Sequence, residues 1–167
     1  SRIEIQPEAV NFQQFISDLL EEYTAIEVEN INLSKIINQH CQFASDLLRL
    51  KIILSNLISN AIKFQNPFNE KKRIDIYIDV NKQNGTIRIT DNGFGIGKEH
   101  IDKIFGMFYR GTDRQQGSGI GLYIVKDCID KLNATIDVKS KLDKGTEFTI
   151  MLPNLHEGQG KEIPLKK

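Results

Sequence analysis

The sequence has few cysteines, no net charge and no long hydrophobic run. Cys41 and Cys128 have no close partner in the sequence, so we expect neither a disulfide framework nor a zinc site, and we expect a reducing, cytoplasmic setting. Lysine plus arginine and aspartate plus glutamate number 22 each, so no overall field attracts nucleic acid or an anionic membrane. No apolar run approaches the roughly 18 residues of a membrane span.

Two common nucleotide-binding motifs are also absent. The chain lacks the G-x-x-x-x-G-K-[ST] pattern of a P-loop and the G-x-G-x-x-G fingerprint of dinucleotide-binding folds. It does not begin with methionine, and we expect it to be a piece of a longer protein. Its 167 residues suffice for one domain with a substantial core.

Hydrophobic periodicity predicts an α+β fold. The segment 46–64 has a helical apolar stripe, segments 27–33 and 35–42 predict two strands, and Asn84-Gly85 predicts a type I′ hairpin turn. We therefore expect a two-layer α/β sandwich, with a mixed, mostly antiparallel sheet and helices on one face. The expected division is a lead-in segment (1–10), one catalytic domain (11–153) and a flexible tail (154–167).

One face of the predicted helix carries Asn56, Asn60 and Lys63, spaced i, i+4 and i+7. The Asn60 amide oxygen is a hard ligand suited to Mg²⁺, Asn56 can orient a phosphate, and Lys63 adds positive charge. A solvated helix face is the alternative. Two asparagines cost a helix a few tenths of a kcal/mol each relative to alanine, which favours a functional purpose.

Two glycine clusters follow. Asp91 precedes Gly93 and Gly95. Its carboxylate can accept a hydrogen bond from the adenine amine, and the glycines let the backbone approach a flat base; an ordinary Asp-Asn-Gly turn is the alternative. The second cluster comprises Gly117, Gly119 and Gly121 and precedes a helix whose free N–H groups can bind phosphate. The alternative there is a flexible loop that ends in an N-cap at Ser118.

In this order, the motifs resemble the catalytic and ATP-binding domain of sensor histidine kinases, in the superfamily of DNA gyrase B, the Hsp90 chaperones and MutL. The likeness covers about residues 8–153. The matching boxes are the N box (Asn56–Phe64), the first glycine box (Asp91–Ile96), the F box (Phe105–Arg110), the second glycine box (Gly117–Leu122) and the last one (Lys144–Thr146). The resemblance implies a Bergerat-type fold that binds ATP and Mg²⁺.

The resemblance also implies a role for each matching residue. Asn60 would bind Mg²⁺, while Asn56, Lys63 and Arg110 would contact phosphates and support transfer. The remaining nucleotide-binding positions would be Phe64, Asp91, Gly93, Gly95, Ile96, Gly117, Gly119, Gly121, Leu122 and Thr146. Residues from about 98 to 116 would form an ATP lid.

The implied reaction is transfer of the γ-phosphate of Mg·ATP to a histidine on an upstream dimerisation domain, and from there to a response regulator receiver domain. No histidine here has the setting of the family's phosphoacceptor. We expect this piece to be monomeric, its parent to be a homodimer, and the parent to be either free or anchored in the inner membrane. The alternatives are a non-catalytic nucleotide-gated module, and a serine kinase or ATPase of the superfamily, where glutamate often stands at the place of Asn56.

Overall fold

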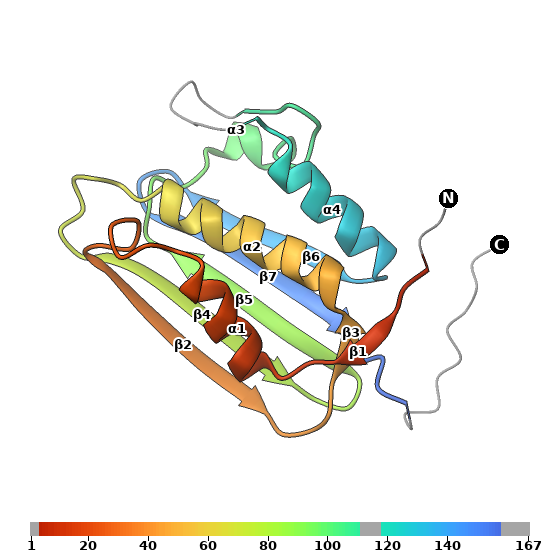
Figure 1. The fold of residues 1–167 in the computed structure, drawn as a ribbon. Coiled ribbons are helices and arrows are strands. Elements are labelled where there is room, and N and C mark those ends of the chain that lie inside the picture. Colours follow the sequence, from red (N-terminus) through yellow and green to blue (C-terminus); the bar gives the residue numbers. More distant parts are fainter. Residues whose placement is uncertain (1–3, 111–117, 158–167) are drawn as a thin grey trace.

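The structure, a computed structural model, describes residues 4–110 and 118–157 and consists of a five-stranded sheet with helices on one face (Figure 1). The strand order is β2-β4-β5-β7-β6, and only the β2–β4 pairing is parallel. The strands are β2 (Ile31–Gln39), β4 (Lys72–Val80), β5 (Asn84–Asp91), β6 (Thr135–Lys141) and β7 (Gly145–Pro153). The predicted α+β sandwich is confirmed.

The helical layer contains α1 (Phe12–Glu21), α2 (Leu47–Lys63) and α4 (Gly121–Lys131), with the four-residue α3 (Lys98–Ile101) beside them (Figure 1). A small second sheet pairs β1 (Pro7–Ala9) with β3 (Ala44–Asp46). Alternate residues of the central strands and the apolar stripes of the helices meet in one core, which includes Ile76, Ile87 and Leu54. Burying these side chains provides most of the favourable free energy of folding.

Helix α2 begins where the sequence predicts. Asp46 is its N-cap, because its carboxylate accepts a hydrogen bond from the Arg49 backbone N–H at 3.0 Å. The predicted stripe of Leu50, Leu54 and Leu57 is buried. The helix therefore fixes the orientation of its polar face, which lies at another angle around the same axis.

Two predictions about individual strands and turns were wrong. Segments 27–33 and 35–42 do not form two strands; β2 is one strand that runs beside β4 along its whole length. The hairpin between β4 and β5 exists, but its turn precedes Asn84 and Gly85, which both lie in β5. The Asn81 side chain accepts hydrogen bonds from the backbone N–H groups of Gln83 and Asn84, at 2.9 and 2.8 Å, and so forms the turn instead.

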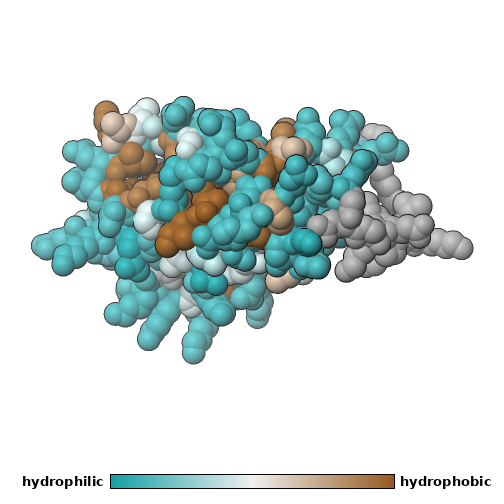
Figure 2. Space-filling view, turned by 90° about the horizontal axis from the view of Figure 1, so that it is seen from below, coloured by the Kyte–Doolittle hydropathy of each residue, from teal (hydrophilic) through white to brown (hydrophobic). Residues whose placement is uncertain are grey.

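The surface is mixed in character. Seen from below, it is mostly hydrophilic, with hydrophobic residues in a few patches (Figure 2). Among the described residues, no helix is both long and apolar enough to cross a bilayer. After β7, the Asn154 side chain donates to the Gln42 carbonyl at 2.8 Å and the Leu155 N–H donates to the Ala44 carbonyl at 3.0 Å, so the described chain stays attached to the domain up to this point.

Candidate functional site

A cavity of about 700 Å³ opens between α2, α4, the ends of β5 and β7 and the loop after β5. It brings together residues from all the predicted motifs. The predicted site residues that line it are Asn56, Asn60, Lys63, Phe64, Asp91, Gly95, Ile96, Arg110, Gly119, Gly121, Leu122 and Thr146. Gly93 does not line it, and Gly117 lies outside the described residues.

Helix α2 supplies one wall of the cavity through Asn56, Asn60 and Lys63. Among the described residues, the Asn60 side chain forms no hydrogen bond, so its amide oxygen is available to a ligand in the cavity. Asn56 is held in place, because its Nδ2 donates to the Ile52 carbonyl at 2.8 Å. This bond leaves the Asn56 oxygen directed away from its own helix.

The Asn56 oxygen lies against the first residue of α4. A Cβ added to Gly121 would be only 2.7 Å from Asn56 Oδ1, closer than real Cβ contacts. A side chain at position 121 would therefore displace the Asn56 amide, a constraint that sequence analysis did not foresee. The alternative in which Ser118 is the N-cap does not hold, because Ile120 occupies the N-cap position and forms no side-chain capping bond.

Asp91, the last residue of β5, also lines the cavity. Its Oδ1 accepts a hydrogen bond from the Gly93 N–H at 2.8 Å, as the predicted Asp-Asn-Gly turn requires. Burial raises the pKa of Asp91 from 3.8 to about 6, although hydrogen bonds from the backbone N–H groups of Gly93 and Thr146 oppose the shift. The turn and the cavity-lining carboxylate thus coexist at one residue.

Protein backbone explains the glycines around Asp91. A Cβ on Gly93 would lie 2.2 Å from the Phe64 carbonyl oxygen, and one on Gly95 would lie 2.0 Å from the Lys141 carbonyl oxygen. Gly95 also has a φ of +69°, which disfavours other residues. We expected these glycines to make room for a base. The structure shows that they let the loop pack against the end of α2 and the β6–β7 turn.

Sequence analysis missed three polar residues near the cavity. His100 Nδ1 and the Tyr109 hydroxyl lie 2.5 Å apart and join α3 to the predicted F box; both line the cavity. The third is Ser140 on β6, whose hydroxyl contacts the Thr146 hydroxyl at 2.8 Å. No sequence motif marks them, because each contact depends on how the loop after α3 or the β6–β7 hairpin folds.

The F box contacts the hydrophobic core only in part. Ile104, just before it, is buried and lines the cavity. Met107 and Phe108, in contrast, have 53% and 66% of their surfaces exposed. The segment therefore packs against the core at Ile104, while Met107 and Phe108 face solvent.

The cavity lining combines chemically different groups. Lys63 and Arg110 provide cationic groups, Asn60 an amide, Asp91 a carboxylate and Thr146 a hydroxyl. Ile96, Leu122 and Phe148 contribute apolar surface. A volume of roughly 300–1,000 Å³ with apolar walls and few polar groups is typical of small-molecule sites.

These residues fit a nucleoside triphosphate, with its base beside Asp91 and its phosphates near Lys63, Arg110 and the N-terminus of α4. Among the described residues, no three His, Cys, Asp or Glu side chains cluster as a metal site. Mg²⁺ would instead be held by the Asn60 amide, phosphate oxygens and water. That donor set suits Mg²⁺, which retains several waters and needs few protein ligands.

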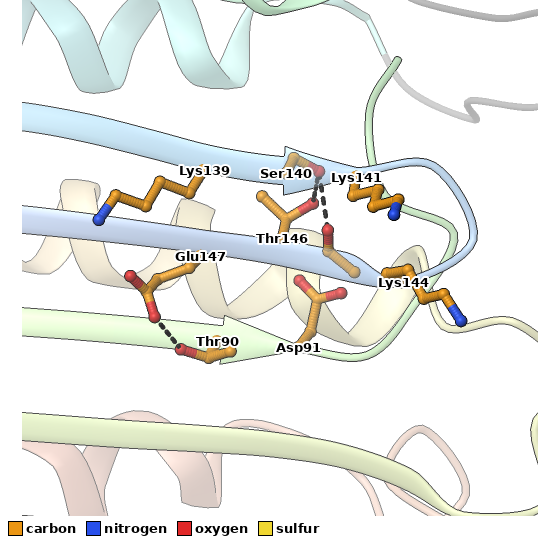
Figure 3. Close-up of a pocket in the computed structure, with 9 residues that line it drawn as sticks. Thr90, Asp91, Lys139, Ser140, Lys141, Lys144, Thr146 and Glu147 are labelled. Atoms are coloured by element: carbon orange, nitrogen blue, oxygen red, sulfur yellow. Dashed lines mark hydrogen bonds between the residues drawn. The ribbon is translucent and has the colours of Figure 1, made fainter. Parts of the chain in front are cut away.

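A second, open depression of about 330 Å³ lies at the ends of β5, β7 and β6 (Figure 3). It shares Asp91 and Thr146 with the large cavity and has Lys139, Lys141 and Lys144 around its rim. The depression therefore adjoins the large cavity at Asp91 and Thr146.

Comparisons with known proteins match this site to a family. The family model described as histidine kinase-, DNA gyrase B- and HSP90-like ATPase matches residues 45–156. The chain is 37% identical over 134 residues to sensor protein SrrB of Staphylococcus aureus strain NCTC 8325 / PS 47. That match covers 76% of the chain but 22% of SrrB, so the chain spans about a fifth of the length of that relative.

Solved structures have the same fold. A mycobacterial sensor histidine kinase, MprB, superposes with a TM-score of 0.74 at 24% identity, covering 90% of this chain and 98% of that one. Full-length ShkA in complex with AMPPNP gives a TM-score of 0.79 at 22% identity, covering 92% of this chain and 32% of that one. At these identities the likeness concerns the fold alone.

Proposed function

Because the chain belongs to the histidine kinase-, DNA gyrase B- and HSP90-like ATPase family, we propose that it is the catalytic portion of a sensor histidine kinase. Its substrate is Mg·ATP, and its product is a phosphohistidine on a dimerisation domain upstream in the parent protein. The observation that carries this proposal is that Asn60, Lys63 and Arg110 share one cavity with Asp91 and Thr146.

The nucleotide is held at both ends. Asp91 accepts a hydrogen bond from the adenine amine, and Ile96 and Phe148 pack near the base. Lys63 and Arg110 stabilise the negative charge of the phosphates, and the N-terminus of α4 faces the same region. When bound, Mg²⁺ supplies further neutralisation of phosphate charge, which is the main requirement of phosphoryl transfer.

Asn56 favours transfer over hydrolysis. A general base must accept a proton from water, and a neutral amide cannot do so. The Asn56 side chain is also fixed by its bond to the Ile52 carbonyl. A neutral imidazole needs no such base, because it is already a nucleophile. The serine kinases and ATPases of the superfamily, which often have glutamate here, are therefore a poorer fit.

A phosphotransfer assay tests the proposal. The chain is mixed with a separate histidine-containing dimerisation domain and γ-labelled ATP with Mg²⁺. We expect label on the acceptor with wild type and at least a tenfold loss with Asn60→Ala, the size that one lost interaction of about 1.4 kcal/mol gives. Asn32→Ala, on the exposed surface of β2, is the matched control. ATP binding without any label on the acceptor would favour the nucleotide-gated module instead.

The partners follow from the same proposal. The upstream dimerisation domain carries the phosphoacceptor histidine, and a response regulator receiver domain accepts the phosphate from it. This piece acts as a monomer and its parent as a homodimer in the cytoplasm or anchored at the inner membrane. Light scattering of the isolated chain tests the first point, because a dimer would contradict it.

A further inference from the structure

The hydroxyl of Ser140 takes part in three hydrogen bonds, and Figure 3 shows it beside the cavity-lining Thr146. It accepts from the Ile96 backbone N–H at 2.8 Å and donates to the Gly145 carbonyl at 2.8 Å. Its third neighbour, at 2.8 Å, is the Thr146 hydroxyl, for which either oxygen could be the donor when that pair is considered alone.

The other two bonds decide the direction of the third. A serine hydroxyl has one hydrogen and two lone pairs. A carbonyl can only accept, so the single hydrogen of Ser140 points at Gly145. The Ile96 N–H can only donate, and it occupies one lone pair. Thr146 must therefore donate its hydrogen to Ser140 and has no hydrogen left to direct into the cavity.

Asp91 lies beside Thr146, and its carboxylate is also a hydrogen-bond acceptor. The two residues are direct partners in the β5–β7 pairing, and Ser140 is the partner of Thr146 in the β6–β7 pairing. The three residues thus form one row across adjacent strands (Figure 3). An ionised carboxylate only accepts, so Asp91 and Thr146 present a pair of acceptors to the cavity.

We propose that Ser140 is a positioning residue that holds Thr146 as an acceptor, and that this pair selects a purine with an amino group at position 6. This inference rests on the proposed ATP site. Adenine offers a donor at position 6, while guanine offers an acceptor there. Thr146 reads the amine either directly, as an acceptor, or through a bound water that accepts from the amine and donates to Thr146; in both arrangements the Thr146 hydrogen points at Ser140.

The test compares ATP with purine riboside triphosphate, which lacks the 6-amino group and is otherwise the same. Calorimetry with Mg²⁺ gives the dissociation constant of each nucleotide for wild type and for Ser140→Ala. The variant also loses the Ile96 bond, which weakens both nucleotides equally. Release of Thr146 weakens only ATP, so the preference for ATP should fall about three- to tenfold, the worth of one hydrogen bond.

A control and a second variant accompany this measurement. Thr90 is on the same strand as Asp91, and its hydroxyl bonds to Glu147 at 3.3 Å on the opposite face of the sheet (Figure 3). Thr90→Val removes a similar bond and should leave the preference unchanged. Thr146→Val keeps the side-chain shape without the hydroxyl and should reduce the preference as much as Ser140→Ala, with no further loss in the double variant.

Each outcome has one meaning. If wild type binds no ATP, the proposed function fails and the inference fails with it. If wild type prefers ATP and Ser140→Ala weakens both nucleotides by the same factor, the site stands and the orienting role of Ser140 is refuted. If Ser140→Ala loses its folded circular dichroism spectrum, an unchanged preference in Thr146→Val refutes the inference.

Discussion

The buried carboxylate of Asp91 should make the ligand-free domain less stable as the pH rises. Its pKa rises from the ordinary 3.8 to about 6 in the folded chain, because burial disfavours the charged form. That difference corresponds to about 3 kcal/mol, at 1.36 kcal/mol per tenfold change in proton affinity. Below about pH 4 the group is protonated in both states. Between pH 4 and 6 it ionises only in the unfolded chain, so stability is lost there.

Urea denaturation of wild type and Asp91→Asn at several values from pH 4 to 8 measures this effect. The asparagine cannot ionise, so the variant should gain stability relative to wild type by up to about 3 kcal/mol between pH 4 and 6, and no more above that range. It should also bind ATP more weakly, since an amide can turn its own donor toward the adenine amine. The substitution would then stabilise the fold while impairing the site.

Asp46 provides a control of opposite sign. Burial raises its pKa, but hydrogen bonds from the backbone N–H groups of Arg49 and Gln6 and the Arg49 charge outweigh burial, so the net pKa is lowered. Asp46→Asn should therefore be less stable than wild type at neutral pH, with a difference that shrinks as the pH falls below about 4. A stability difference for Asp91→Asn that is flat across pH 4–7 would refute the reasoning about its burial.

Three further predictions concern two glycines and Asn56. Gly95→Ala should lower the free energy of unfolding by at least about 2 kcal/mol, because residue 95 has a positive φ and a Cβ there would clash with the Lys141 carbonyl. The control Gly97→Ala should cost less, because the added Cβ would meet only a flexible side chain. Equal losses for both variants in urea denaturation would contradict this prediction. Gly121→Ala should change the free energy of unfolding by less than about 1 kcal/mol, but it should reduce phosphotransfer roughly ten- to a hundredfold by displacing Asn56. Unchanged phosphotransfer would contradict the close packing of Gly121 against the Asn56 amide oxygen. Asn56→Glu should raise ATP hydrolysis at least about tenfold by supplying a base, measured as phosphate release; no increase would contradict the role given to the amide.

Much of the fold was predictable because it depends on local spacing. The apolar stripe and the N-cap of α2 lie within one segment, so helical periodicity was enough to place Asn56, Asn60 and Lys63 on a common face. The apolar alternation of Ile74, Ile76, Ile78 and Val80 in β4 is likewise a local pattern, typical of a half-buried strand. The turn at Asn81 was mislocated because a side chain, rather than positive φ at a glycine, forms it.

The sequence by itself determined which chemical groups the chain has: amides and a lysine on one helix face, and a carboxylate at the end of a strand. Only the tertiary structure decided which groups meet. Asp91 and Thr146 are partners through the pairing of β5 with β7, and the proton of Thr146 is directed by a serine on a third strand. Asp91 and Thr146 come from distant parts of the sequence, whereas Ser140 and Thr146 belong to one hairpin. In both pairs the contact depends on strand register, which no local pattern in the sequence specifies.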